Sequence, residues 1–386
     1  MGNQPDTSLE SFDVVIVGGG PAGISTALHL LQLDPAWRSR LVVLEKERHP
    51  REKLCGGGVT PYGESILGSL GLLPLGVPHV GVGEARLQFE DLIVAVRKTP
   101  AFRITCRAEF DAWLSACARE RGINIREEEA ATGLEAGHGQ AMVSTTRSRY
   151  RAQILVGADG SKGIVRRQAG LDGPGRVARL LEVLTPEDPD AAPEFTQQFA
   201  TFDFSPLTQG VQGYYWDFPS LVGGRAYMNR GIFDARVQSR RPRAPLKDLL
   251  VQYLETRARS LARLELKGHP LRWFGRRGPF SRPRVLLVGD SAGADPLFGE
   301  GISFALGYGQ IAAQTIEAAF RSGDFSLRDY GRRILAAPLG RTLQLRRLAA
   351  DLLYQALDRR LYRLLLRALP LMTRLRVKEH ASPVLP

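Results

Sequence analysis

The stretch Val14-Val15-Ile16-Val17-Gly18-Gly19-Gly20-Pro21-Ala22-Gly23 decides the fold of this 386-residue chain. Four apolar residues typical of strands run into a glycine-rich turn, and the residues after the turn favour a helix. Gly18 allows the tight turn, Gly20 lets a pyrophosphate approach the backbone, and Gly23 lets the helix pack closely on the strand. The spacing therefore predicts a strand–turn–helix unit that binds an adenine dinucleotide at the helix N-terminus.

The next strand supports the same interpretation. Leu41–Leu44 is apolar and ends at Glu45, about 20 residues downstream of Gly23. A carboxylate at this distance is suited to hold a ribose 2′-hydroxyl. The order of strand, turn, helix, strand and acid is much more specific than the glycines alone. A glycine-rich loop without a ligand is the alternative.

The composition indicates a globular protein of a reducing compartment. The apolar fraction is 44%, and no apolar run reaches the length of a membrane span. Acidic residues precede Val14 without a basic segment, so the first apolar run is a strand and not a signal peptide. Cys55, Cys106 and Cys117 form no C-x-x-C pair, which argues against an iron–sulfur cluster and a disulfide framework. We therefore expect a cytoplasmic protein without a metal site.

Positive charge gathers near the C-terminal end of the chain, whose net charge is +12. From Arg341 to Lys378, ten basic residues face only Asp351 and Asp358, and leucines interleave with them. The pattern predicts a basic helical tail over residues 336–386. One interpretation is peripheral contact with the inner face of an anionic membrane; the other is a helix packed on its own protein. We expect no nucleic-acid binding, because no basic stripe with stacking aromatics appears elsewhere.

Two later segments resemble the first strand. Ile154–Gly160 is an apolar run that ends in Asp159-Gly160, and Val285–Asp290 is another that ends in Gly289-Asp290. Both predict buried parallel strands, and the second precedes a helix expected over 301–320. The aromatic-rich region between them predicts further strands and a helix near 246–261. The nucleotide-binding unit is therefore interrupted by a second domain.

Four further segments carry a resemblance to a known family. They are Lys53-Leu54-Cys55-Gly56-Gly57-Gly58, Arg107–Leu114, Tyr214-Tyr215-Trp216-Asp217-Phe218-Pro219, and Gly289–Gly293 with Pro296 and Gly299–Ile302. In this order they resemble the geranylgeranyl reductases, which share the para-hydroxybenzoate hydroxylase fold of FAD-dependent enzymes. The resemblance covers roughly residues 12–330. Ser291 departs from the pattern, because alanine is usual at that position.

The resemblance implies an α/β fold in which a Rossmann-like FAD-binding domain carries an inserted mixed-sheet substrate domain. The FAD-binding domain would comprise residues 10–80, 100–175 and 276–335, and the substrate domain residues 81–99 and 176–275. It implies that Asp290 accepts hydrogen bonds from the ribityl chain and that Asp159 lies toward the pyrophosphate. The full set of residues expected to bind the cofactor is Gly18, Gly20, Ala22, Gly23, Glu45, Cys55, Gly56, Arg107, Asp159, Asp290, Gly301 and Ile302.

The chemistry of two of these regions agrees with that assignment. Arg107 is a permanent cation suited to a pyrophosphate, although a surface ion pair with Glu109 or Asp111 is an equal alternative. Gly299 and Gly301 leave backbone N–H groups bare at a helix N-terminus. This positive end would stabilise negative charge near N1 of a reduced flavin.

The catalytic candidates are Cys55, Tyr214 and Trp216. The resemblance puts Cys55 beside the isoalloxazine, whereas most free cysteines are small buried thiols. Tyr214, Trp216 and Phe218 alternate and so share one face of a strand. They predict either the wall of a pocket for a hydrophobic substrate or the core of the second domain.

The sequence bears on two classes of enzyme and one class of non-enzymatic protein. In the first, reduced FAD passes hydride to a C=C bond of an isoprenoid, with NAD(P)H or reduced ferredoxin as a transient donor. The second is a flavin monooxygenase or halogenase; halogenases carry W-x-W-x-I-P and need a lysine, for which Lys53 and Lys98 are the candidates. The third, an electron-transfer partner of a membrane dehydrogenase, needs iron–sulfur ligands that three scattered cysteines do not supply.

Overall fold

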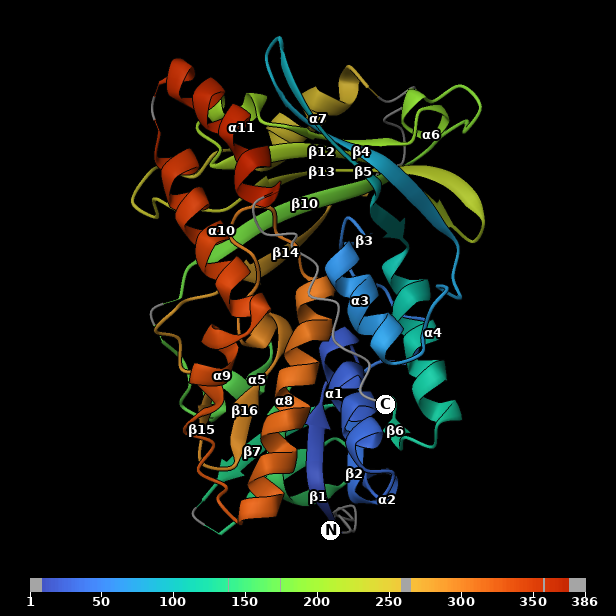
Figure 1. The fold of residues 1–386 in the computed structure, drawn as a ribbon, viewed down its shortest axis with the longest axis vertical. Coiled ribbons are helices and arrows are strands. Elements are labelled where there is room, and N and C mark those ends of the chain that lie inside the picture. Colours follow the sequence, from blue (N-terminus) through green and yellow to red (C-terminus); the bar gives the residue numbers. More distant parts are fainter. Residues whose placement is uncertain (1–8, 138, 174, 258–264, 357, 375–386) are drawn as a thin grey trace, which may run out of the picture.

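Two eight-stranded sheets organise the chain in the computed structural model, which describes residues 9–374 apart from 138, 174, 258–264 and 357. In Figure 1 one sheet lies in the lower half of the molecule with the long helices α1 (Pro21–Leu33) and α8 (Ile302–Ser322) against it. The other sheet crosses the upper half. A ligand site built from both sheets would therefore lie where the two halves meet.

The lower sheet contains the three apolar runs predicted as parallel strands. Its strands follow the order β15-β16-β9-β1-β2-β6, and β7 and β8 extend it beyond β9. The pairs β1–β2, β1–β9 and β9–β16 are parallel, as expected. The residues from Val14 to Val17 are buried, because helices cover the sheet. The strand bounds are β1 (Leu9–Val17), β2 (Leu41–Leu44), β6 (Ile125–Arg126), β7 (Ala131–Ala136), β8 (Ala141–Thr145), β9 (Arg149–Gly157), β15 (Ser281–Arg282) and β16 (Val285–Leu287).

The upper sheet is mixed. Its order is β14-β10-β13-β12-β11-β4-β5-β3; the pair β11–β4 is parallel, and the other pairs are antiparallel. The strands are β3 (Gly58–Val59), β4 (His79–Phe89), β5 (Leu92–Thr105), β10 (Val177–Pro186), β11 (Phe199–Asp203), β12 (Gly213–Val222), β13 (Arg225–Asp234) and β14 (Lys267–Arg272). Apart from β3, which lies in the segment predicted for the FAD-binding domain, this sheet takes residues 79–105 and 177–272, and the predicted substrate domain was 81–99 and 176–275. The first segment is longer because β4 and β5 form one extended hairpin.

Most helices cover the lower sheet or flank the junction. α3 (Pro61–Ser69) packs against α8, and α4 (Arg107–Glu120) packs against α1. α7 (Leu246–Glu255) ends before the predicted 261, and residues 258–261 lie outside the described part. The remaining short helices are α2 (Trp37–Arg40), α5 (Ile164–Gln168) and α6 (Pro193–Thr196).

The C-terminal helices run along one side of the molecule from the lower to the upper sheet (Figure 1, red). They are α9 (Tyr330–Ala336), α10 (Pro338–Gln355) and α11 (Arg359–Arg374). Leu339 and Leu343 of α10 belong to the lower core, whereas Ala350 and Leu353 belong to the upper core. α10 is therefore packed on its own protein and joins both halves. In the described part of the chain, no helix has the length and apolar character needed to cross a membrane.

Candidate active site

One large cavity lies where the two sheets meet. Its volume is about 1590 Å³, and its walls come from the glycine turn, the upper sheet, α8 and α10. Pockets for single drug-sized ligands measure roughly 300–1,000 Å³, so this cavity has room for a cofactor and a second molecule. It is lined by every predicted site residue except Gly23.

The glycine turn forms the cofactor end of the cavity. Gly18 has φ +112°, and a side chain there would overlap the Ala158 carbonyl. A side chain at Gly23 would overlap the Gly18 carbonyl, so Gly23 permits contact between helix and turn from behind the cavity wall. Gly20 faces more open space, and α1 has no side-chain cap at its N-terminus. Free N–H groups of α1 therefore remain available for a phosphate.

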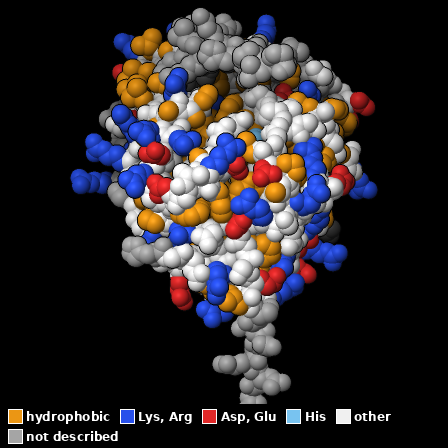
Figure 2. Space-filling model, turned by 60° about the horizontal axis from the view of Figure 1, so that its bottom comes forward, with side chains coloured by type: hydrophobic (Ala, Val, Ile, Leu, Met, Phe, Trp, Pro, Cys, Tyr) orange, Lys and Arg blue, Asp and Glu red, His pale blue; other side chains and the backbone are white. Residues whose placement is uncertain are grey.

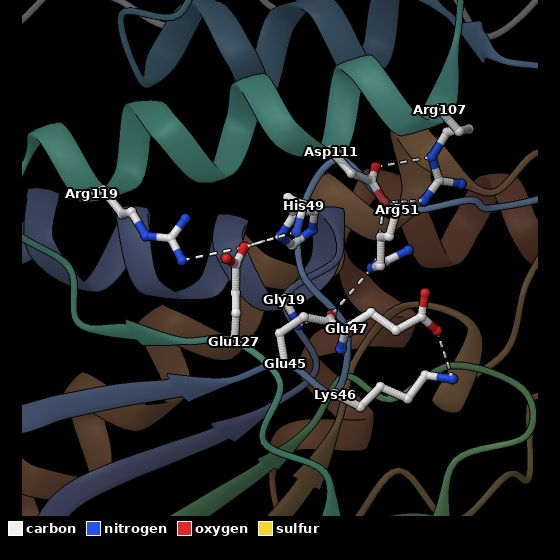
Figure 3. Close-up of polar contacts among 10 residues, drawn as sticks. All are labelled: Gly19, Glu45, Lys46, Glu47, His49, Arg51, Arg107, Asp111, Arg119 and Glu127. Atoms are coloured by element: carbon white, nitrogen blue, oxygen red, sulfur yellow. Dashed lines mark hydrogen bonds and ion pairs between the residues drawn. The ribbon is translucent and has the colours of Figure 1, made fainter.

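Glu45 and Arg51 flank this turn (Figure 3). Glu45 Oε2 accepts a hydrogen bond of 2.9 Å from the Gly19 backbone N–H and lies 3.4 Å from Arg51 Nε. Arg51 Nη2 also lies 3.4 Å from Asp111 Oδ2, and the arginine lines the cavity. Arg51 is a functional candidate that the sequence analysis missed. The available signal was a cation a few residues after the expected ribose-binding acid.

Arg107 combines the two alternatives considered from the sequence. Its Nε and Nη2 donate to Asp111 at 3.0 and 2.9 Å, so the ion pair with Asp111 exists (Figure 3). The pair is buried rather than on the surface, and Arg107 also lines the cavity. Burial alone would lower the pKa of Arg107, but Asp111 and Cys55 reverse this effect and raise the pKa. Arg107 is therefore a fixed positive charge at the cofactor end.

Asp159, Asp290 and the start of α8 line the cavity next to the glycine turn. Asp159 accepts hydrogen bonds from the Val165 N–H at 2.9 Å and from Ser291 Oγ at 3.1 Å, and burial raises its pKa. The serine that departs from the family pattern thus braces this carboxylate. Gly301 is the N-cap of α8 and has no side-chain cap. The first N–H groups of α8 therefore face the same cavity as Asp290 and Ile302.

Cys55 and Gly56 lie between the cofactor end and the aromatic wall. The Gly57 N–H lies 3.4 Å from Cys55 Sγ, and Arg107 also hydrogen-bonds this sulfur. A side chain at Gly56 would meet the Phe218 ring at 2.9 Å. The glycine therefore lets the loop lie flat against the upper sheet.

Tyr214, Trp216 and Phe218 form an aromatic wall on the upper sheet. Phe202 extends it, with a ring-centroid distance of 5.0 Å to Phe218. The Tyr214 hydroxyl donates to the Phe298 carbonyl, and Trp216 Nε1 donates to Asn229 Oδ1 at 2.8 Å. Burial raises the pKa of Tyr214 well above its usual value. The Tyr214 hydroxyl and the Trp216 indole N–H are therefore hydrogen-bonded within the protein, and the rings of these two residues line the cavity.

Arg346 of α10 enters the cavity from the C-terminal helices. Its Nη1 lies 2.6 Å from Asp295 Oδ2 and 2.6 Å from Glu300 Oε2, and Asp295 is fully buried. Burial raises the pKa of Asp295, whereas Arg346 opposes this shift. The ion pairs fix the loop before α8. The sequence analysis placed Arg346 in a basic tail, because no local pattern shows that its partners lie about fifty residues upstream.

A group of lysines lines one part of the cavity. The chain has only seven lysines, and Lys46, Lys53, Lys162 and Lys267 all line the cavity around His269. Lys53 Nζ lies 3.0 Å from His269 Nε2. Burial, together with Lys53, Lys162, Arg107 and Lys46, lowers the pKa of His269 to about 3, and burial lowers the pKa of Lys53. On the face shown in Figure 2, by contrast, basic side chains are spread among acidic ones.

The cavity fits FAD at its cofactor end. Side chains at Gly18 or Gly23 would collide with the backbone of the turn, two helix N-termini open toward it, and the carboxyl groups of Glu45 and Asp290 line it as possible hydrogen-bond acceptors. Consistent with this, residues 11–307 match the protein family described as FAD binding domain.

Known proteins narrow the family further. The chain is 30% identical over 331 residues to digeranylgeranylglycerophospholipid reductase 2 of Methanothermobacter thermautotrophicus, covering 81% of this chain and 79% of that protein. A geranylgeranyl bacteriochlorophyll reductase-like structure from Thermoplasma acidophilum matches with a TM-score of 0.78 and 23% identity, over 93% and 92% of the two chains. A p-nitrophenol 4-monooxygenase from Pseudomonas putida has a TM-score of 0.69 and 19% identity, over 95% and 97%.

The fold and the cavity define an FAD-dependent oxidoreductase with a para-hydroxybenzoate hydroxylase-like architecture. Within that class, the chain belongs to the geranylgeranyl reductase family.

Proposed function

We propose that this protein reduces carbon–carbon double bonds of an isoprenoid or a similar hydrophobic substrate. The observation that carries the proposal is a single cavity whose lining includes both the glycine turn and a group of apolar side chains, here called the apolar chamber. The chamber is lined by Leu87, Val96, Phe102, Phe202, Phe218, Phe298 and Leu345. Such walls suit a hydrocarbon chain, because they offer dispersion contacts and few polar partners.

Reduced FAD would supply the hydride for this reaction, and the residues of the chain would hold and orient the reactants. Arg107, the glycine turn and the start of α8 would bind the charged parts of the cofactor. The aromatic wall would hold the alkene against the flavin and exclude water from it. The similarity to a digeranylgeranylglycerophospholipid reductase of Methanothermobacter supports an isoprenoid lipid as the substrate class.

We further propose NAD(P)H as the electron donor. Four lysines around His269 line a part of the cavity that suits a phosphate-bearing molecule. Reduced ferredoxin is the alternative. Anaerobic flavin bleaching by NADPH, weakened in Lys162→Ala but not in Lys247→Ala, would support the proposal; bleaching by reduced ferredoxin alone would contradict it.

The central test is reoxidation of the dithionite-reduced enzyme. Mixing it anaerobically with a geranylgeranyl lipid should restore the oxidised absorbance and yield products heavier by two hydrogens per reduced bond. Reoxidation by oxygen alone, accelerated by an aromatic compound, would instead favour the monooxygenase or halogenase. The specific observation behind this second candidate is that Lys53 and Lys98 both line the cavity, although Lys53 Nζ faces His269.

We also propose peripheral contact with an anionic membrane. Leu348 and Leu352 on α10 and Leu361 and Leu364 on α11 are 52, 51, 42 and 62% exposed, which is unusual for large apolar side chains. Arg360 and Arg367 are exposed near them. Apolar side chains next to cations match a lipid surface with anionic head groups.

A further inference from the structure

The cavity face of the upper sheet carries a row of three residues on adjacent strands. Trp216 on β12 pairs with Gly231 on β13, and Gly231 pairs with Glu182 on β10. Side chains of directly paired residues lie on the same face of a sheet. Because Trp216 lines the cavity, Glu182 points toward the same side.

Gly231 leaves room for the indole of Trp216. A side chain at Gly231 would overlap the outer edge of that ring, so the indole covers the glycine in the direction of Glu182. The indole N–H is directed to Asn229 Oδ1 at 2.8 Å. This hydrogen bond fixes the orientation of the Asn229 amide.

Asn229 and Glu182 hold the two polar backbone atoms of Cys55. Asn229 Nδ2 donates to the Cys55 carbonyl at 3.1 Å. The Cys55 backbone N–H faces the Glu182 carboxylate and lowers its pKa. The loop that carries the thiol is thus held by two side chains of the upper sheet, whereas the thiol itself contacts Arg107 of α4.

Glu182 is a buried carboxyl that the chemistry described above does not use. It is 7% exposed, and its Oε2 has no hydrogen-bond partner in the described part of the chain. Burial raises its pKa to about 7, Arg107, Lys53 and the Cys55 N–H oppose that shift, and Glu52 adds to it. Lys267, the next residue of the row on β14, is paired with Glu52 and Glu265. The charge of Glu182 therefore changes near neutral pH.

We propose that Glu182 is a positioning residue that, together with Asn229, clamps the Cys55 peptide and so fixes the thiol at the flavin end of the cavity. Glu182 is not among the described residues that line the cavity, so it acts through Cys55 rather than on substrate. This inference rests on the proposed function only in that it assumes that Cys55 lies beside bound FAD.

The first test measures alkylation of Cys55 by iodoacetamide in the FAD-loaded protein, with Cys106 and Cys117 as internal references. Glu182→Ala and Asn229→Ala should each raise the Cys55 rate by roughly fivefold or more, because the loop is released. Glu182→Gln keeps an acceptor for the Cys55 N–H and should stay near the wild-type rate. An unchanged rate in Glu182→Ala and Asn229→Ala would overturn the clamp.

The second test follows the visible absorbance of bound FAD between about pH 5.5 and 8.5. The wild type should show an inflection near pH 7, which Glu182→Gln removes and Glu194→Gln retains. Glu194 is a matched control because burial also raises its pKa, away from Cys55. Persistence of the inflection in Glu182→Gln would overturn the proposal even if Glu182→Ala does not fold. Neither readout uses an alkene, so a failure of the reductase proposal would leave both results interpretable.

Discussion

The two ends of the cavity are built in different ways. The cofactor end is largely backbone: a glycine turn, two uncapped helix N-termini and a few charges. The substrate end is largely side chains, contributed by β4, β5, β11, β12 and α10. A backbone-built end depends on a few local residues that permit no replacement, whereas a side-chain-built end tolerates change and sets specificity.

The largest effect is expected for Gly18→Val at the backbone-built end. The branched side chain would have to adopt φ +112° and overlap the Ala158 carbonyl, so the turn cannot keep its shape. The purified variant should lack the flavin absorbance of the wild type. Gly81→Ala, at a glycine outside the cavity where an added carbon has nothing within 4 Å, should retain its FAD. Yellow Gly18→Val protein would contradict this account of the turn.

Arg346→Met tests the ion pairs by which α10 holds the loop before α8. The change leaves Asp295 and Glu300 without their cation, and losing one partner of a buried pair destabilises a protein by about 3–5 kcal/mol. Urea unfolding of the FAD-loaded variant measures this loss. Arg321→Met, which removes an exposed pair with Glu317, should change stability by less than about 1 kcal/mol.

The deficit of Arg346→Met should depend on pH. Burial raises the pKa of Asp295 in the folded state, so its ionisation opposes folding. Such a group has no effect below its unfolded pKa, and its penalty grows as pH rises toward the folded pKa. Without Arg346 the folded pKa rises further. The deficit should therefore be smaller near pH 5 than near pH 8, and the opposite trend would refute this assignment.

Phe218→Ala tests the side-chain-built end. Removing the ring enlarges the cavity and should lower stability by about 3 kcal/mol while raising the KM for the alkene roughly tenfold. FAD should remain bound, because the cofactor end is untouched. Phe204 is a matched control, since it is fully buried in the same core but does not line the cavity. Phe204→Ala should lose similar stability without the change in KM; a higher KM in both variants would refute a substrate-specific role for Phe218.

The smallest effect is expected outside the cavity. Replacing Leu348 and Leu352 with serine should leave stability nearly unchanged, because both are exposed, but should weaken sedimentation with phosphatidylglycerol vesicles several-fold. Leu33→Ser, an equally exposed position at the end of α1, is the control. Equal vesicle binding by all three proteins would remove the support for membrane contact by α10.

The same contrast explains how far the sequence could predict the molecule. The apolar runs ending at Gly18, Asp159 and Asp290 identify parallel strands, because local pattern and buried position coincide there. These three runs also predicted that the strands assemble into one sheet and that the cofactor is FAD. β7 was missed, since Ala131–Ala136 alternates weakly and is stabilised by pairing with β8.

Apart from Arg51, the roles that were missed depend on contacts between residues distant in sequence. Glu182 matters because of Cys55, and Arg346 matters because of Asp295 and Glu300; no spacing rule connects these pairs. The tail illustrates the point. Its composition allowed both a membrane helix and a packed helix, and only the three-dimensional structure shows that α10 is packed.

The position of Arg346 also bears on how the protein is made. Glu45 is synthesised about 300 residues before Arg346. At ~5–20 residues per second this interval lasts roughly 15–60 s. During that interval the nascent chain already has its first strand and turn, but not α8 or the helix that secures the loop before it. The lining of the cavity is therefore complete only after α10 has been synthesised, and until then its apolar side chains lack part of their covering.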